Sequence, residues 1–530
     1  MMILRSALRW LAPLLALAVA SMAHAQTANT AQVDAQLAPA ANCATFVKTD
    51  LRQLEYPTML MSSEVVQESA DLPAHCKVTG VIQPQVQFEI RLPLAWNGRY
   101  YQRGCGGFCG VISIDKCDHA LARDFVVAAN NMGHVGLPVK DPVWGNVPAL
   151  REDYGPLSTH KLAVVAKAVA EKFYGKRPAF SYLEGCSTGG REGLGSAQHY
   201  PDDFDGIVAG DPAFPGRLGA LANNWDARHL LRPDGTTVFT PEKKALLAGA
   251  VMTACDELDG LRDGIIMDPR RCSYDPVALQ CRDGDGPGCL TAEQVMVAQA
   301  LYEGPRDSQG RALMPGAGAP RGSELSWSGA GRLALAGGYL GYLAFAENPP
   351  KDWNWRDFDF DRDVSKVEAA AALYDPVAPY EAPDLGAFHA AGGKLLVYHG
   401  WADPGVSPFA MLDYYGQVVH REGGMDAVRD WFRVFMVPGM FHCRGGNAPN
   451  TFDMLTPIVN WVEKGVRPDG IRAEQRDEAG KLMRSRPLYA YPRYAEFTGG
   501  DPDKAESWAP AAPAGPVDDR DNDWVWAPKS

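Results

Sequence analysis

The chain has 530 residues, a formal net charge of −13 and an isoelectric point near 5.4. This length excludes a small binding module and is sufficient for a large core with a second domain or a long insertion. The acidic balance argues against nucleic acid or an anionic membrane surface as a partner, although it is also typical of any soluble surface.

The first 25 residues predict a secretion signal. Arg5 and Arg9 precede an apolar run from Trp10 to Ala20, and Ala23-His24-Ala25 offers small residues for cleavage. The run is too short to cross a bilayer, and an anchoring N-terminal helix is the less favoured alternative. The mature protein is therefore expected to be exported, either to the periplasm or out of the cell. Most of its 11 cysteines should then form disulfides, with at least one left unpaired.

Strand and helix patterns alternate along the first part of the mature chain. Phe125-Val126-Val127 is typical of a buried strand. A helix is expected from Ser158 until Gly175 ends it. Strands are expected at 86–92, 99–102, 124–130, 180–183 and 207–209, with a second helix at 191–198. This alternation predicts an α/β fold with a mostly parallel sheet and helices on both faces.

The alternation stops near residue 215 and resumes after residue 375, with strands expected at 394–398 and 431–437. The intervening stretch holds four of the cysteines together with glycine- and proline-rich segments. An insertion that splits one α/β core explains this pattern most simply. The predicted division is a signal peptide at 1–25, core at 26–215, an inserted domain at 216–375, core again at 376–500 and a surface tail at 501–530.

The pentapeptide Gly185-Cys186-Ser187-Thr188-Gly189 matches the nucleophile-elbow motif G-x-S-x-G. In such an elbow the serine stands on a tight turn from strand to helix, and the next backbone N–H faces the reacting carbonyl. The motif alone is weak, since many matches are ordinary turns. Cys186 beside Ser187 and Cys443 beside His442 make it more specific, because a bond between these cysteines would join a nucleophile to its base.

Asp403 and His442 complete a candidate catalytic set with Ser187. Each follows a predicted strand, and the order Ser187, Asp403, His442 is that of α/β-hydrolases. Residues at the carboxyl ends of parallel strands meet at one edge of the sheet. An imidazole can take the serine proton, and a carboxylate can orient the imidazole.

Two alternatives remain for these positions. Asp403 would otherwise cap a turn before Pro404, and His399 would otherwise compete as the base. His399 precedes Asp403 in the chain, so it is interpreted as a structural loop histidine. The oxyanion would be bound by the backbone N–H of Thr188 and by a second N–H after the 99–102 strand, at Cys105 or Gly106.

Three stretches carry a family resemblance: Gly185-Cys-Ser-Thr-Gly-Gly-Arg191, His399-Gly-Trp-Ala-Asp403 and Gly439-Met-Phe-His-Cys443. With them the chain resembles the tannase and feruloyl esterase family, which also contains mono(hydroxyethyl) terephthalate hydrolase, over nearly the whole mature sequence. The resemblance implies an α/β-hydrolase core with a large lid domain inserted between the nucleophile and the acid. It also implies disulfides, which would pair Cys186 with Cys443, Cys255 with Cys272, Cys43 with Cys76, and Cys281 with Cys289.

The function that follows is an exported serine esterase that hydrolyses carboxylic esters of aromatic, phenolic acids through an acyl-enzyme. Thr188 favours the feruloyl esterase and tannase members over the terephthalate mono-ester hydrolase, which is the nearest alternative. A serine peptidase or an inactive calcium-binding hydrolase fold is less favoured. Trp327, Trp353, Trp355, Tyr339 and Tyr342 are candidates for the substrate pocket, although most are expected to be lid core.

The segment from Cys255 to Ile265 brings three aspartates and two glycines into one short loop. Hard oxygen donors suit calcium, but the spacing is not that of an EF-hand, and a solvated acidic turn is the alternative. Family resemblance implies a structural calcium ion in the lid, and no organic cofactor is expected. Its ligands would be the side chains of Asp256, Asp259 and Asp263 and the backbone carbonyls of Leu261 and Ile265.

Cys105, Cys109 and Cys117 surround the expected oxyanion loop. In an oxidising compartment a disulfide is favoured over a metal site. We expect Cys109 to pair with Cys117 and Cys105 to remain free, although the sequence leaves the pairing open.

Overall fold

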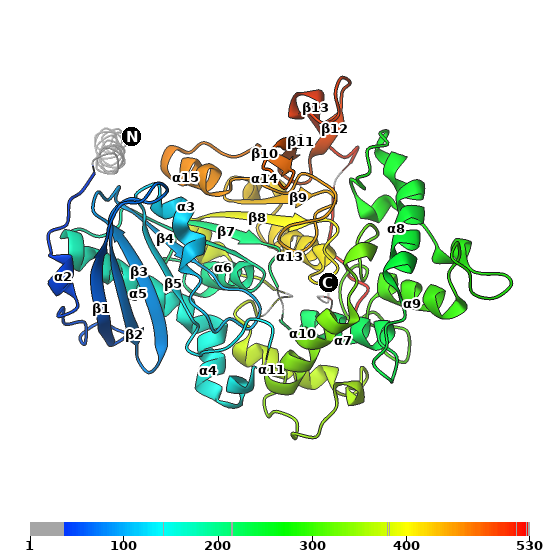
Figure 1. Cartoon of the computed structure of the whole chain (residues 1–530), viewed down its shortest axis with the longest axis horizontal. Coiled ribbons are helices and arrows are strands. Elements are labelled where there is room, and N and C mark those ends of the chain that lie inside the picture. The colour runs from blue at the N-terminus through cyan, green and yellow to red at the C-terminus, as the bar shows by residue number, and fades with distance from the viewer. Residues whose placement is uncertain are drawn as a thin grey trace, which may run out of the picture.

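A nine-stranded sheet runs through the molecule (Figure 1). The computed structural model describes residues 36–527 except 141, 214, 215, 379, 381, 516 and 526, so the predicted signal peptide lies outside the described residues. The strands are β1 (Thr58–Val66), β2 (His75–Ile82), β3 (Val86–Pro93), β4 (Arg99–Arg103), β5 (Val126–Asn130), β6 (Phe180–Cys186), β7 (Gly206–Gly210), β8 (Lys394–Gly400) and β9 (Phe432–Val437). Their spatial order is β1-β2-β3-β5-β4-β6-β7-β8-β9.

The sheet is parallel from β5 to β9 and antiparallel at its N-terminal edge. Strands β5, β4, β6, β7, β8 and β9 pair in parallel, which agrees with the sequence prediction. Strands β1, β2 and β3 pair antiparallel with their neighbours. The sequence does not predict β1, because Met59 and Met61 lie on its exposed side and leave no continuous buried run.

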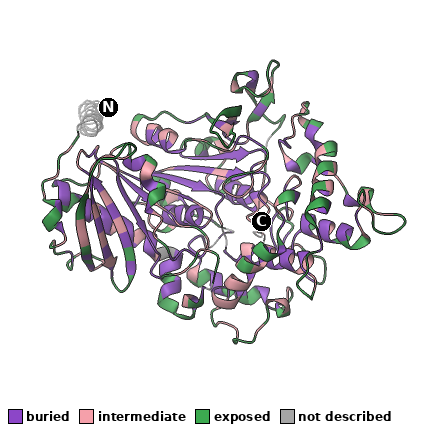
Figure 2. Cartoon of the chain, in the orientation of Figure 1, coloured by how far each residue is buried: buried purple, intermediate pink, exposed green. Residues whose placement is uncertain are grey.

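Alternate residues of the central strands face two separate apolar clusters. Val126 of β5 packs in the cluster that includes α5 (Ser158–Tyr174), α6 (Thr188–His199) and α13 (Pro408–Arg421). Val127 packs in the opposite cluster with α15 (Leu455–Lys464). Because side chains alternate between the faces of a strand, the buried strands in Figure 2 require helices on both faces.

Residues 216–375 contribute no strand to the nine-stranded sheet among the residues that the structure describes. They form helices α7 (Gly216–Leu230), α8 (Pro241–Cys255), α9 (Ala292–Glu303), α10 (Gly329–Tyr342) and α11 (Val364–Tyr374). Leu247, Leu301 and Trp327 belong to an apolar cluster within this segment. Figure 1 shows α8 and α9 to the right of the sheet, with α7 and α10 below them. None of the helices in the described chain combines the length and apolar character needed to span a bilayer.

The segment after residue 501 is more integrated than a surface tail. Strand β13 (Trp508–Ala511) pairs with β12 (Tyr494–Phe497). Trp508 and Trp524 are each 6% exposed, and Trp524 joins the largest apolar cluster. These tryptophans keep the segment on the protein despite its high content of proline and aspartate. The remaining elements are α2 (Cys43–Phe46), α3 (Asp118–Leu121), α4 (Pro148–Glu152), α12 (Gly386–Ala390), α14 (Met425–Val428) and the hairpin of β10 (Gly470–Arg476) with β11 (Leu482–Tyr489).

A buried ion pair fixes α15 against the sheet. The guanidinium of Arg99 on β4 donates two hydrogen bonds of 2.6 Å to the carboxylate of Glu463, whose side chain is 5% exposed. Tyr182 on β6 donates a third hydrogen bond to the same carboxylate at 2.7 Å. Glu463 therefore holds two strands and one helix together.

Replacing Glu463 with alanine should lower the free energy of unfolding by about 3–5 kcal/mol, because it leaves a buried arginine without its carboxylate. Thermal and urea unfolding measure this loss. Glu171→Ala is the matched control, since its pair with Arg177 at 2.9 Å is largely exposed and should change stability little. Equal losses from the two variants would contradict the structural role of Glu463.

Candidate active site

Ser187 occupies the sharp turn between β6 and α6. Its φ of 63° and ψ of −119° are strained for a residue with a side chain. The turn is tight because a Cβ on Gly185 would lie only 2.6 Å from the Cα of Gly189. A Cβ on Gly104, in the loop after β4, would meet the same Cα at 2.6 Å. These close approaches give Ser187 the geometry of a nucleophile elbow.

His442 and Asp403 are joined by a hydrogen bond. His442 Nδ1 lies 2.6 Å from Asp403 Oδ2, and Asp403 is fully buried. The other carboxylate oxygen accepts the backbone N–H groups of Gly405 at 2.8 Å and Val406 at 3.0 Å. Because Nδ1 faces the carboxylate, Nε2 is left as the basic nitrogen. Ser187 and His442 line the same cavity, so the structure brings the three sequence-predicted residues together.

Charges around this pair set its protonation. Burial alone would lower the pKa of His442, but the carboxylate of Asp403 and its hydrogen bond outweigh burial and raise this pKa to about 9. Burial opposes the charged form of Asp403, but His442 and His399 keep its pKa well below the usual range. The carboxylate therefore stays ionised and stabilises a protonated His442.

A disulfide joins Cys186 to Cys443 across 257 residues. It links the residue before Ser187 to the residue after His442, as the family resemblance implies. The other implied pairs, Cys43 with Cys76, Cys255 with Cys272 and Cys281 with Cys289, are also present. The elbow and the histidine loop are thus held together by a covalent bond.

The loop after β4 lies against the elbow and offers one free donor. The N–H of Cys105 donates to Glu192 Oε1 at 3.0 Å, so it is not available to a substrate. Among the described residues, the N–H groups of Gly106 and Thr188 have no acceptor. The Thr188 hydroxyl donates to the carbonyl of Gly107 at 2.7 Å and ties the loop to the elbow. Of the two predicted candidates for the second oxyanion donor, this geometry favours Gly106.

The expected pairing of Cys109 with Cys117 is wrong. Cys105 and Cys109 form the disulfide, and Cys117 is a buried free thiol. Cys105 and Cys109 flank a tight turn closed by the N–H of Cys109 donating to the carbonyl of Gly106 at 3.0 Å. Cys117 instead packs in the apolar cluster beneath the sheet, where burial raises the pKa of its thiol.

A second imidazole and a second carboxylate lie behind Asp403. His399 Nε2 is 3.6 Å from Asp403 Oδ2 and 3.9 Å from Asp211 Oδ1, and all three residues are fully buried. His399 also donates to the carbonyl of Val406 at 3.0 Å. Burial alone would lower the pKa of His399, but Asp403 and Asp211 raise it. Burial raises the pKa of Asp211 to about 6.

Sequence reasoning missed Asp211. It follows β7 directly, and an acidic residue just after a parallel strand is the signal that identified Asp403 after β8, so the signal was present. His399 lies behind Asp403 and is not the hydrogen-bonded partner that Asp403 orients toward Ser187, but the expectation of a loop residue is wrong, because His399 lies within β8. Its contacts with two carboxylates nevertheless make it part of the charge network of the site.

The cavity over Ser187 has a volume of about 500 Å³ and walls from both the core and the inserted segment. Its aromatic lining comprises Phe108, Tyr154, Tyr339 and Phe441. Of the five predicted lid aromatics, only Tyr339 lines it. Trp327 belongs to the lid core, Trp353 and Tyr342 pack against apolar clusters, and Trp355 stacks with Arg356.

Arg332 on α10 is a lining residue that no sequence motif marks. It is 8% exposed, and its guanidinium lies 3.2 Å from Asp226 Oδ2 and donates to Asn223 Oδ1 at 3.2 Å. A Cβ on Gly405 would lie 2.7 Å from its Nη1, which places this cation beside the loop that carries Asp403. Burial raises the pKa of the neighbouring Asp226 to about 7.

The predicted calcium loop contains a carboxylate oxygen without a partner among the described residues, while the Asp256 carboxylate accepts backbone N–H groups of residues 263–265. Asp259 Oδ2 is buried and has no hydrogen-bond partner in the described chain. Burial raises the pKa of Asp259, and Asp263 and Asp256 add to this shift. Arg486 pairs with Asp263 and opposes the rise in the pKa of Asp259. An orphaned carboxylate oxygen in such a loop fits a hard cation with oxygen ligands.

The structure has the features that define an α/β-hydrolase. A strained serine follows a parallel strand, a buried aspartate–histidine pair lies on later loops, and a helical insertion separates the serine from that pair. Residues 65–511 match the family model of tannase and feruloyl esterase, and the chain belongs to this family.

Relatives agree with this assignment. The chain is 31% identical to mono(2-hydroxyethyl) terephthalate hydrolase of Piscinibacter sakaiensis, with 84% of this chain and 86% of the relative covered. It is 32% identical to a probable feruloyl esterase of Arthroderma benhamiae, with 79% and 81% covered. The crystal structure of feruloyl esterase B from Aspergillus oryzae superposes with a TM-score of 0.76 at 26% identity, covering 89% of this chain and all of that one. The protein is therefore a carboxylic ester hydrolase.

Removing the Cys186–Cys443 bond by double alanine substitution should lower the free energy of unfolding by about 4–5 kcal/mol, as expected for so long a loop. The rate constant kcat for 4-nitrophenyl acetate hydrolysis should fall more than KM rises, because the elbow and the histidine loop lose their fixed separation. Cys281→Ala with Cys289→Ala is the matched control, since that bond closes only 8 residues in the lid. Unchanged kcat in the first variant would rule out a positioning role.

Proposed function

We propose that this protein hydrolyses esters of aromatic, phenolic carboxylic acids by a serine mechanism. The observation that carries the proposal is the cavity in which Ser187 and His442 lie beneath aromatic and apolar walls. Such walls suit an aromatic acyl group, because aromatic rings stack on one another and bury a large apolar area. The names of the relatives support the same substrate class.

The proposed reaction proceeds in two halves. Ser187 Oγ attacks the ester carbonyl carbon while His442 Nε2 takes its proton, and the N–H groups of Thr188 and Gly106 stabilise the oxyanion. His442 then protonates the departing alcohol oxygen as its bond to the acyl carbon breaks. Water attacks the acyl-enzyme as His442 takes its proton, and the acid leaves as Ser187 Oγ recovers a proton. Asp403 orients His442 throughout and stabilises its protonated form.

Hydrolysis of a terephthalate mono-ester is the second candidate, because Arg332 places a buried cation in the catalytic cavity. A substrate carboxylate would need such a partner. Asp226 lies 3.2 Å from this cation, but burial raises the pKa of Asp226 to about 7, so its carboxyl group is only partly ionised near neutral pH. Above this pKa the ionised Asp226 would compensate Arg332 and favour a neutral aromatic ester over an anionic one.

Ser187→Ala should lower kcat by a factor of about 10⁴ or more, since the nucleophile is lost. Initial rates on methyl ferulate, methyl gallate, mono(2-hydroxyethyl) terephthalate and a peptide anilide test the proposal. The two phenolic methyl esters should be preferred. Ser326→Ala is the matched control, because Ser326 lines the same cavity and should retain activity.

Other outcomes identify the competing functions. Preferred turnover of the terephthalate ester would select the second candidate, and turnover of the anilide would indicate a peptidase. Failure of Ser187 to react with a fluorophosphonate probe would indicate an inactive fold. Activity retained in Ser187→Ala would refute the serine mechanism.

The proposed base predicts a pH dependence. His442 must be neutral to accept a proton, so kcat/KM should rise with pH through its pKa, which is raised to about 9. Asp211 contributes to raising this pKa. Asp211→Asn should therefore move the acid limb of the kcat/KM profile to lower pH by on the order of one unit.

The matched control for this shift is Asp413→Asn. Asp413 is also a buried carboxylate, but it accepts hydrogen bonds from Tyr380 and from the N–H of Asp521 and does not line the catalytic cavity. Its removal should leave the acid limb in place. An unchanged limb in Asp211→Asn, or equal shifts in both variants, would contradict the proposed charge network.

We also propose that the loop from Asp256 to Ile265 holds a structural calcium ion. The ligands would be the side chains of Asp256, Asp259 and Asp263, with the carbonyls of Leu261 and Ile265. Arg486 alone does not compensate the three carboxylates of this loop, and the ion would supply the remaining positive charge. The nearby Cys255–Cys272 bond supports a structural role. Export of the protein is consistent with five disulfides and with the predicted leader.

Chelation by EDTA should lower the melting temperature, and added calcium should restore it, because the ion binds the folded loop only. Asp259→Asn should weaken this response, since Asp259 offers the unpartnered oxygen. Asp285→Asn is a control in another exposed lid loop, where the carboxylate pairs with Lys243. A melting temperature that is the same with EDTA and with calcium would argue against the ion.

A further inference from the structure

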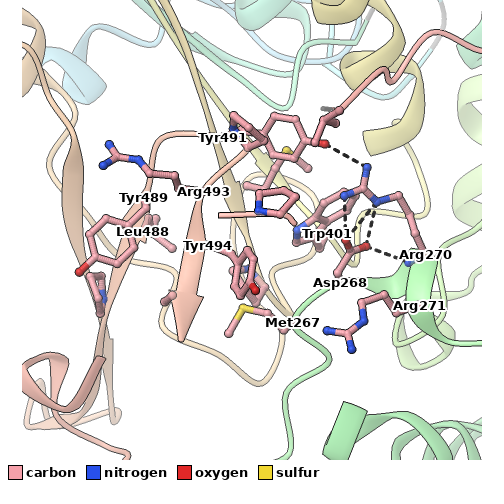
Figure 3. A pocket seen from close by; sticks show the side chains of 17 residues that line it. Met267, Asp268, Arg270, Arg271, Trp401, Leu488, Tyr489, Tyr491, Arg493 and Tyr494 are labelled. Atoms are coloured by element: carbon pink, nitrogen blue, oxygen red, sulfur yellow. Dashed lines mark hydrogen bonds and ion pairs between the residues drawn. The ribbon is translucent and has the colours of Figure 1, made fainter. Parts of the chain in front are cut away.

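A second cavity of about 310 Å³ lies beside the active site and shares no lining residue with the catalytic cavity. Its walls come from the lid segment 267–271, the ends of β11 and β12, and the C-terminal segment (Figure 3). Trp401 and Pro438 also line it, and they belong to the loops that carry Asp403 and His442. The cavity is therefore built on the outer side of both catalytic loops.

One wall of this cavity is a fixed stack. The guanidinium of Arg270 lies over the ring of Trp401 at 4.8 Å and near that of Tyr491 at 5.7 Å. Asp268 and Asp519 accept its N–H groups at 2.7 and 2.9 Å. Because this cation is paired with two carboxylates, it serves as a rigid surface and not as the anchor for a ligand.

The aromatic surface that remains open belongs to Tyr494, because Tyr489 packs against the apolar cluster that contains Trp508. Figure 3 shows Tyr494 between the Arg270 side and the Tyr489 side of the cavity. In the described chain neither ring stacks on another aromatic ring, and neither hydroxyl has a hydrogen-bond partner. Tyr494 is 38% exposed, and Met267 supplies an apolar floor. A flat ring would gain stacking and sulfur contacts here.

Arg271 supplies a cation without a partner. Its side chain is exposed at the cavity, and no described carboxylate pairs with it. Arg493 lies on the opposite side (Figure 3). It donates to the backbone carbonyl of Asp469 at 3.3 Å and lies 3.4 Å from the carboxylate of Asp469, which Arg433 already occupies at 2.6 Å. On a chain with a net charge of −13, this is a local excess of positive charge.

We infer that this cavity is a binding site for a small aromatic carboxylate, with the ring against Tyr494 and Met267 and the carboxylate on Arg271. The aromatic surface selects a ring over an aliphatic acid, and the unpaired arginine selects an anion over a neutral ester. The binding site stands on its own geometry. That the ligand is also the acid which the enzyme releases rests on the proposed function.

The test uses the full chain in calcium buffer after fluorophosphonate treatment, which blocks the catalytic cavity by modifying Ser187. Isothermal titration calorimetry with ferulate should then show one remaining site per chain. Arg271→Ala and Tyr494→Ala should each weaken this binding about tenfold or more, as expected for loss of a charge-assisted bond or a stacking surface. Methyl ferulate, which lacks the charge, should bind about tenfold more weakly.

Arg282→Ala is the matched control, because Arg282 is an exposed lid arginine outside this cavity, and it should bind ferulate as the parent does. Melting temperatures confirm that each variant is folded. Loss of all binding in the blocked protein would overturn the site, as would unchanged binding in both cavity variants. If the fluorophosphonate does not react, the proposed function fails, and the same titration on Ser187→Ala should still show binding sensitive to Arg271→Ala.

Discussion

The bond between Cys186 and Cys443 is the constraint on which the arrangement of the site depends. Strands β6 and β9 are separated in the sheet by β7 and β8, a distance of about 14 Å at the usual strand spacing. The Cα atoms of the two cysteines are nevertheless 6.1 Å apart. The loop after β9 must therefore bend back across the ends of β8 and β7. Gly400 allows this, since a Cβ there would meet the carbonyl of Met440 at 2.4 Å.

Bending the loop across the sheet edge buries charges that water would otherwise solvate. Asp211 lies between the disulfide and β8, with Oδ2 3.6 Å from Cys186 Sγ and Oδ1 accepting the N–H of Gly400 at 2.9 Å. The buried carboxylates of Asp211 and Asp403 both contact His399. They cannot both be ionised without compensating cations. His399 and His442 provide that compensation, so the buried aspartates and the imidazoles form one electrostatic unit. The basicity of His442 is therefore a property of the whole edge and not of Asp403 alone.

The sequence predicted the three residues that meet at the site, because each of them comes soon after a parallel strand. Ser187 directly follows β6, and Asp403 and His442 lie on the loops that follow β8 and β9. Sequence reasoning failed where the outcome depends on how a turn closes or on contacts between distant segments. The pairing of Cys105 with Cys109 depends on how the 106–108 turn closes, and the charge balance of Arg332 depends on α7 packing against α10. No local pattern encodes either contact.

The C-terminal segment is a second case in which the local sequence does not predict the structure. Its composition resembles a solvated tail, but two tryptophans outweigh the surrounding prolines and aspartates because each buries a large apolar area. Once Trp524 is packed, Asp519 is held near Arg270, and Arg270 is held over Trp401. The loop that ends in Asp403 is thus supported on its outer side by the lid and by the last residues of the described chain. The walls of both cavities consequently depend on the two loops that carry Asp403 and His442. Trp401 is two positions from Asp403, so a change in the packing of Trp401 acts on the loop that holds the catalytic aspartate.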